Sequence, residues 1–108
     1  MNDRINALKN LLADDPEDSF LHYALGLEYV KAGDTELALE RFEILLHKHP
    51  DYLPVYYQAA HLYLENNNRE NADIAFKKGI ALANRLGNNK TYQELMNAYN
   101  NFLYEEDD

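Results

Sequence analysis

The sequence contains no cysteine, and this absence removes several classes of chemistry at once. A chain without thiols cannot be held by disulfides, use a thiol nucleophile or bind metal through thiolates. The start of the chain also lacks the apolar run of a signal peptide. No stretch reaches the 18 or so apolar residues that a membrane-spanning helix requires. These absences lead us to expect a cytoplasmic protein.

Side chains suited to catalysis or cofactor binding are scarce as well. Ser19 is the only serine, and it falls at a predicted helix start, where serine commonly serves as a cap. The four glycines are isolated, so the chain has no glycine-rich phosphate loop. His61 and Glu65 could share a helix face, but two ligands outside a HExxH-type motif do not specify a metal site. We therefore expect no enzyme activity, no cofactor and no metal.

Basic charge is limited and dispersed. Ten Lys and Arg residues are scattered among nineteen Asp and Glu residues, which gives a formal net charge of −9. Nucleic-acid-binding proteins usually carry a basic patch or stripe, so neither nucleic acid nor an anionic membrane surface is an expected partner. A basic or neutral partner is easier to accommodate. Residues 105–108 are all acidic, and because like charges repel we expect a disordered tail there.

The chain does contain helical periodicity along most of its length. Apolar residues recur at a spacing of about 3.6, and β-branched residues are too few for a competing strand pattern. Gly33, Gly87 and the run Asn66–Asn68 fall where helices are expected to end. Asp18 or Glu17 is the expected cap of the second helix, the third is expected to start at Thr35 or Asp34, and Asp51 is the expected cap of the fourth. The predicted helices cover residues 2–13, 18–32, 35–48, 52–66, 69–86 and 89–104.

A period of 34 residues relates the two central parts of the chain. Several pairs share this offset: Pro16 and Pro50, Tyr29 and Tyr63, Glu36 and Glu70, Ala38 and Ala72, Phe42 and Phe76. Short turns make neighbouring helices antiparallel, and hairpins that repeat at this period stack into a solenoid. Small residues such as Gly26 and Ala60 allow close helix approach, and the two phenylalanines fill the space between hairpins.

This pattern resembles the tetratricopeptide repeat family, whose repeats follow W-x-x-L-G-x-x-Y, then A-x-x-x-F, then P. The first copy here is His22-x-x-Leu25-Gly26-x-x-Tyr29, Ala38-x-x-x-Phe42 and Pro50. The second copy is Tyr56-x-x-Ala59-Ala60-x-x-Tyr63 and Ala72-x-x-x-Phe76, with Asn84 in place of the proline. The resemblance implies an all-α fold of about six helices, a right-handed α-solenoid of antiparallel pairs. It would form a single domain over residues 1–104, with an N-terminal helix in 1–15, repeats over 16–50 and 51–86, and a capping helix over 88–104.

A second apolar face remains on the first helix of each repeat. Tyr56 and Tyr57 are neighbours and point about 100° apart, so they cannot both face one core. Tyr56 belongs to the buried pattern, which leaves Tyr57 to another surface. In this family that side of the first helix lines the concave groove. The resemblance therefore implies an aromatic and aliphatic groove formed by Phe20, Tyr23, Leu27, Val30, Tyr57, His61 and Leu64.

An exposed apolar groove is typical of a binding surface, and tyrosine combines large contact area with a hydroxyl group. The sequence predicts a protein-interaction module or adaptor that binds a peptide or a helix of another protein. Two alternatives stay open, namely burial of the groove in a homodimer and filling of the groove by the terminal helices. Some family members clamp chaperone carboxylates with Lys and Asn at groove positions. Tyr23, Leu27, Tyr57 and His61 occupy those places here, so that function is not implied.

Overall fold

The computed structural model describes residues 3–106, and these form six α-helices and no strand. The helices are α1 (Asp3–Asp14), α2 (Ser19–Lys31), α3 (Thr35–Lys48), α4 (Pro54–Glu65), α5 (Arg69–Leu86) and α6 (Asn89–Glu106). The all-α prediction with about six helices is confirmed, and every predicted helix end lies within two residues of the observed one. The chain divides into two compact units, residues 1–55 and 56–108. The stacking of the hairpins into one right-handed domain stays a prediction.

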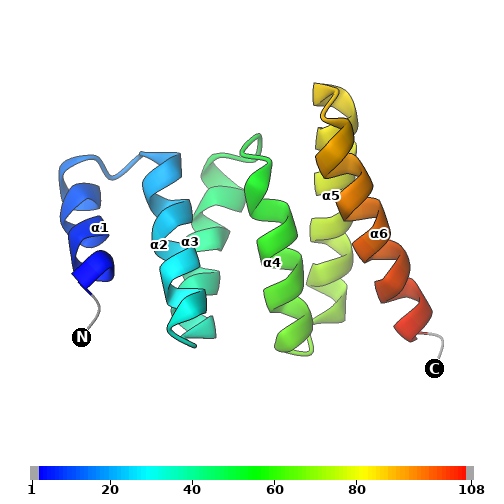
Figure 1. Cartoon of the computed structure of the whole chain (residues 1–108), viewed down its shortest axis with the longest axis horizontal. Helices are drawn as coiled ribbons and strands as arrows, with labels where there is room; N and C mark the ends of the chain where they lie inside the picture. The colour runs from blue at the N-terminus through cyan, green and yellow to red at the C-terminus, as the bar shows by residue number, and fades with distance from the viewer. Residues whose placement is uncertain (1–2, 107–108) are drawn as a thin grey trace. The chain divides into compact units, whose positions relative to one another are not determined.

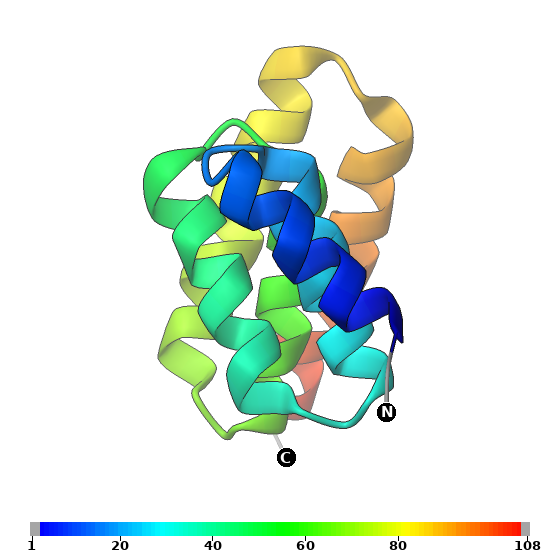
Figure 2. The same cartoon turned by 90° about the vertical axis from the view of Figure 1, so that its left-hand side faces the viewer.

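In the N-terminal unit, α2 and α3 form an antiparallel hairpin, and α1 lies obliquely across α2 (Figures 1 and 2). Leu25, Phe42 and Leu45 are completely or almost completely buried in its core. Gly26 is required at its position because an added Cβ would lie 2.4 Å from Cε1 of Phe42. Glu28, a buried carboxylate on α2, holds α1 in place through an ion pair with Arg4 at 3.2 Å.

His22 occupies the position where the family pattern has tryptophan. Its side chain is buried, and its Nε2 lies 2.8 Å from the carbonyl oxygen of Pro16, at hydrogen-bond distance. The imidazole therefore ties the start of α2 to the preceding turn. The structure thus places a buried histidine, at hydrogen-bond distance from a carbonyl oxygen, at this packing position.

In the C-terminal unit, α5 and α6 lie side by side, and α4 contacts α5 through Tyr56 (Figure 1). A Cβ added to Gly79 on α5 would lie 2.6 Å from the Cβ of Tyr56. Phe76 is completely buried and packs against the rings of Tyr99 and Phe102 on α6, at 5.6 and 5.7 Å between centroids. Aromatic rings on α5 and α6 thus pack together in the core of this unit.

The helix caps follow the polar residues next to each turn. Asp18, Asp34, Asn68 and Asn88 each accept a hydrogen bond from a backbone N–H three residues later, as N-cap side chains do. Gly33 and Gly87 adopt positive φ angles of 80° and 71°, and Asn67 adopts 60°, the left-handed conformation at helix ends. The cap predicted at Asp51 is wrong, because α4 begins only at Pro54. Proline suits the first turn, where its missing N–H would have no partner.

The acidic tail predicted over residues 105–108 is wrong in its first part, because α6 continues to Glu106. Phe102, in the last full turn before this point, is buried and accepts a hydrogen bond at its carbonyl from Arg69 of α5 at 3.1 Å. The Arg69 guanidinium also lies over the Phe102 ring, 4.4 Å from its centroid. These contacts anchor the end of α6 against α5. Residues 107–108 lie outside the described part of the chain.

Candidate partner-binding cleft

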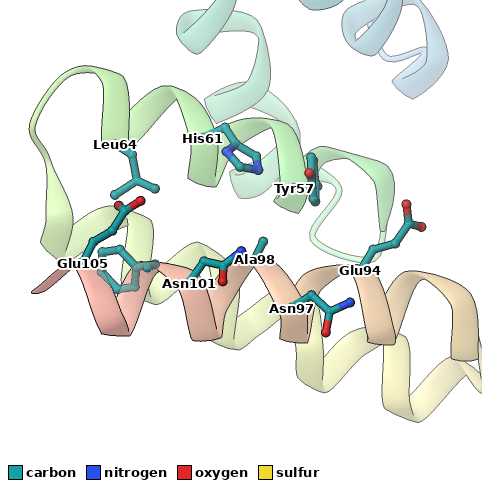
Figure 3. Close-up of a pocket in the computed structure, with 9 residues that line it drawn as sticks. Tyr57, His61, Leu64, Glu94, Asn97, Ala98, Asn101 and Glu105 are labelled. Carbon is teal, nitrogen blue, oxygen red and sulfur yellow. The ribbon is translucent and has the colours of Figure 1, made fainter.

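A cleft of about 450 Å³ opens between α4 and α6 in the C-terminal unit (Figure 3). Three of the predicted groove residues, Tyr57, His61 and Leu64, line one wall. The other wall is a face of α6. The lining residues on α6 are Glu94, Asn97, Ala98, Asn101, Phe102 and Glu105.

The α4 wall explains why two tyrosines stand next to each other. Tyr56 is buried with only 3% of its surface exposed and packs over Gly79, whereas Tyr57 is 39% exposed and lines the cleft. One turn further along α4, the His61 ring packs on Tyr57 with 4.3 Å between centroids. His61 also meets the buried Phe76 edge-on, with 6.1 Å between centroids. The exposed tyrosine is therefore held in place by a ring that is itself anchored in the core.

His61 favours its neutral form in this setting. Burial lowers the pKa of its imidazole below the ordinary value of 6.5, and the negative charge of Glu65 opposes this effect only in part. Its Nε2 is buried without a hydrogen-bond partner within residues 3–106. At neutral pH the α4 wall is thus an uncharged aromatic and aliphatic surface.

The α6 wall is polar and was not predicted from the sequence. Glu94, Asn97, Asn101 and Glu105 recur at spacings of three, four and four residues, which places them on one face of the helix. Leu95 and Phe102 of α6 are buried, and their burial determines which face of α6 lines the cleft. The polar spacing is visible in the sequence, but its meaning depends on knowing which helix it faces.

The other four predicted groove residues lie on α2 in the N-terminal unit. Phe20 is 63% exposed and Val30 is 37% exposed, while Tyr23 and Leu27 are half-buried. Tyr23 packs against Tyr52 and Phe42, with 5.4 and 5.9 Å between ring centroids. The Tyr23 ring therefore packs partly in the core of the N-terminal unit and is only partly exposed. A single groove that joins these residues to Tyr57, His61 and Leu64 stays a prediction.

Metal ligation, membrane spanning and the position of Ser19 can also be assessed in the structure. Within residues 3–106, no three His, Asp or Glu side chains are grouped so as to hold a metal ion. No helix in the same range is long and apolar enough to cross a membrane. Ser19 is the first residue of α2, and Asp18 rather than Ser19 caps that helix.

Comparisons with known proteins agree with this architecture. The tetratricopeptide repeat profile matches residues 53–85. The crystal structure of a tetratricopeptide repeat domain protein from Salinibacter ruber is 34% identical, covers 80% of this chain and 96% of its own, and superposes with a TM-score of 0.76. A solution structure of a tetratricopeptide repeat domain protein from the same organism is 34% identical, with 81% and 88% coverage and a TM-score of 0.75.

A protein from Bordetella parapertussis shares the fold at lower identity. Its solution structure is 22% identical, covers 98% of this chain and 92% of its own, and has a TM-score of 0.82. A comparison with curated proteins gave no significant match. Tetratricopeptide repeats generally mediate binding between proteins and generally act as non-enzymatic scaffolds. With the repeat pattern, the helical hairpins and a relative at 34% identity in agreement, this chain belongs to the tetratricopeptide repeat family.

Proposed function

We propose that this protein is an interaction module that binds a peptide or helical segment of another protein on the aromatic faces of α2 and α4. The face of α4 consists of Tyr57, His61 and Leu64, and it lines the cleft opposite α6. The equivalent face of α2 consists of Phe20, Tyr23, Leu27 and Val30. Binding, rather than turnover, is the activity that these side chains support.

The observation that carries the proposal is the half-exposed Tyr57 in a cleft. A tyrosine with 39% of its surface exposed still offers a large apolar area, and few torsion angles need to be ordered on binding. The cleft of about 450 Å³ falls within the size range of sites that enclose a small ligand or a few residues of a peptide. The rings of His61 and Phe76 hold Tyr57 in place, so little rearrangement is needed.

Self-association is the second candidate function, and Phe20 is the observation that favours it. A phenylalanine that is 63% exposed, on the same face of α2 as the exposed Val30, would be covered if two copies met through α2. In that case the aromatic face of α2 would be an interface of a structural homo-oligomer rather than a site for a foreign peptide.

Selection from a random peptide library, followed by binding measurements, tests the proposal. We expect selected peptides to bind wild type and to lose at least about tenfold in affinity for Phe20→Ser/Tyr57→Ser, as substitution of aromatic anchors commonly does. Tyr104→Ser is the matched control, because Tyr104 is 75% exposed on α6 and does not line the cleft. Equal loss in the control, or no selectable peptide, would contradict the proposal.

Light scattering over a dilution series separates the two candidate functions. A monomer for wild type leaves the aromatic faces available to a peptide. A wild-type dimer that Phe20→Ser/Tyr57→Ser converts to a monomer would establish self-association instead. Phe20 is preferred to Tyr23 for this variant, because removal of the Tyr23 ring would also remove its packing on Phe42.

A further inference from the structure

We infer that the α4/α6 cleft takes an extended peptide segment with two basic side chains about five residues apart on either side of an apolar residue. This inference rests on the proposed function and specifies the chemistry of the partner. It is carried by the charge, the length and the lining of the cleft.

The charge of the cleft is negative and uncompensated. Its lining includes the carboxylates of Glu94 and Glu105 but no lysine or arginine. Among residues 3–106, neither carboxylate lies within ion-pair distance of a basic side chain, whereas five other ion pairs are formed. A partner with positive charge would supply the missing counter-charges, and an acidic segment would be repelled.

The two glutamates mark the two ends of the cleft. Figure 3 shows Glu94 at the Tyr57 end and Glu105 at the Leu64 end, with Asn97 and Asn101 between them. The glutamates are eleven positions apart, and at a rise of 1.5 Å per residue this corresponds to about 16.5 Å along α6. An extended chain rises about 3.3 Å per residue, so about five residues of a partner would span that distance.

The polar α6 wall of the cleft favours an extended occupant over a helix. The Asn101 amide and the NH₂ group of Asn97, whose Oδ1 accepts a hydrogen bond from Gln93 at 3.3 Å, offer hydrogen-bonding groups to the unpaired backbone of an extended segment. A helical partner would satisfy its own backbone and leave these amides without a role.

The middle of the occupant is expected to be apolar. Between the two glutamates, the α4 wall presents the ring of Tyr57, the uncharged His61 and the side chain of Leu64. An aliphatic or aromatic residue between the two basic ones would bury its surface there. The aliphatic stem of a lysine or arginine near Tyr57 would also pack on the ring, with its charge directed at Glu94.

Peptide selection with wild-type protein, followed by affinity measurements on variants, tests this inference. We expect the selected eight-residue peptides to contain Lys or Arg at a spacing of about five around an apolar residue. Their affinity is expected to fall roughly 3- to 20-fold for Glu94→Gln/Glu105→Gln, as two partly exposed ion pairs allow. It should also weaken as NaCl rises from about 0.05 M to about 0.5 M, because salt screens such pairs.

The matched control is Glu36→Gln/Glu70→Gln. It makes the same change in net charge at two first-turn glutamates of α3 and α5 that do not line the cleft. We expect the affinity of this control variant for the selected peptides to stay within about twofold of wild type, because salt screens exposed charges that do not line the cleft. An equal loss in this control would overturn the inference in favour of a general charge effect.

The remaining outcomes separate this inference from the proposed function. Selected peptides that depend on Tyr57 but carry no basic pair, or that ignore Glu94→Gln/Glu105→Gln, would overturn the inference and leave the proposed function intact. If the wild type is a dimer and Tyr57→Ser alone dissociates it, the occupant of the cleft is a second copy of the chain. This outcome would also overturn the inference. Failure to select any peptide would overturn both.

Discussion

The two helical hairpins of this chain, α2–α3 and α4–α5, achieve close helix packing with glycine on opposite helices. In the first hairpin, Gly26 lies on the first helix, under the ring of Phe42. In the second, the equivalent of Gly26 is Ala60, and the essential glycine is Gly79 on the second helix, against the Cβ of Tyr56. In each hairpin, therefore, a close approach depends on a glycine at a different position of the repeat.

The sizes of two further equivalent positions change together. At an offset of 34 residues, His22 and Leu45 of the first repeat correspond to Tyr56 and Gly79 of the second. The first repeat thus has a histidine and a leucine where the second has a tyrosine and a glycine. Protein interiors are close-packed, so the Tyr56 side chain requires a glycine opposite it. The comparison shows that each repeat must be read as a packed pair of helices, rather than position by position.

The largest expected effect is that of Gly79→Ala. The new Cβ would lie 2.6 Å from the Cβ of Tyr56, an atom fixed to the backbone, and 3.1 Å from Leu95. Overpacking lowers the free energy of unfolding by up to about 3 kcal/mol. The higher helix propensity of alanine raises it by about 1 kcal/mol, so we expect a net decrease of about 2 kcal/mol. Urea unfolding followed by circular dichroism measures this. Because the clash is with the Cβ of Tyr56, Tyr56→Leu should not relieve it. Rescue of stability by that change would show that the ring, and not the Cβ, requires glycine at position 79.

Gly26→Ala should be less damaging and, unlike Gly79→Ala, should be rescued. Its Cβ would meet ring atoms of Phe42 at 2.4 to 2.9 Å, and a shorter side chain removes those atoms. We expect a loss of about 1.5 kcal/mol for Gly26→Ala alone. A double-mutant cycle with Phe42→Leu should show a favourable coupling of at least about 0.5 kcal/mol, as contacting residues do. Additive losses would mean that the ring does not fill the space above Gly26.

Polar contacts attach the terminal helices to the hairpins, and Tyr99→Phe tests the contact in the C-terminal unit. The Tyr99 hydroxyl donates a hydrogen bond of 2.7 Å to Asp73 of α5, and this bond, assisted by Lys77, lowers the pKa of the Asp73 carboxyl below its ordinary value of 3.8. Loss of the bond should cost about 1 kcal/mol at pH 7. A lowered pKa stabilises the fold above pH 3.8, so the difference should shrink as pH falls through and below that value.

Urea titrations at several pH values between about 3 and 7 measure this difference, and Tyr104→Phe is the control because Tyr104 is exposed. A difference that stays constant down to the lowest pH would show that the hydroxyl acts through packing and not through the Asp73 carboxylate.

The smallest expected effect comes from His61→Leu, which gives the second repeat the residue found at the equivalent Leu27. Burial lowers the pKa of His61 below 6.5, so protonation in the unfolded chain destabilises the native wild type as pH falls below that value. The charged group that acts on the imidazole is Glu65 on α4, and Glu94 and Glu105 on α6 line the same cleft. We expect the variant to gain about 0.5 kcal/mol over wild type between about pH 7.5 and pH 5.5. Parallel stability curves across this range would refute the effect.

The sequence was sufficient to predict what depends on local chemistry and on the period. Helix spacing, the turn glycines and the asparagine run defined six helices, and the 34-residue offset identified Phe42 and Phe76 as buried. The neighbouring tyrosines were separated correctly into the buried Tyr56 and the exposed Tyr57. Each of these conclusions needs only the geometry of one helix or the comparison of two copies.

What the sequence could not provide depends on contacts between distant segments. Gly79 matches no position of the repeat pattern, and only the approach of Tyr56 shows why it is required. The face of α6 that lines the cleft became clear once Leu95 and Phe102 were seen to be buried. Arg69 holds the end of α6 from 33 residues away, which is why the predicted tail at residue 105 was placed too early. No local pattern encodes such pairings.

The most direct test of the α4/α6 cleft as a peptide-binding site is chemical-shift mapping by NMR with a selected peptide. We expect the amide shifts during titration to concentrate on α4 around Tyr57, His61 and Leu64 and on the facing side of α6 around Asn97 and Asn101. Tyr57→Ser should abolish these shifts at the same peptide concentration. Shifts confined to α1 and α3, or to the exposed Tyr104, would contradict the assignment of the cleft.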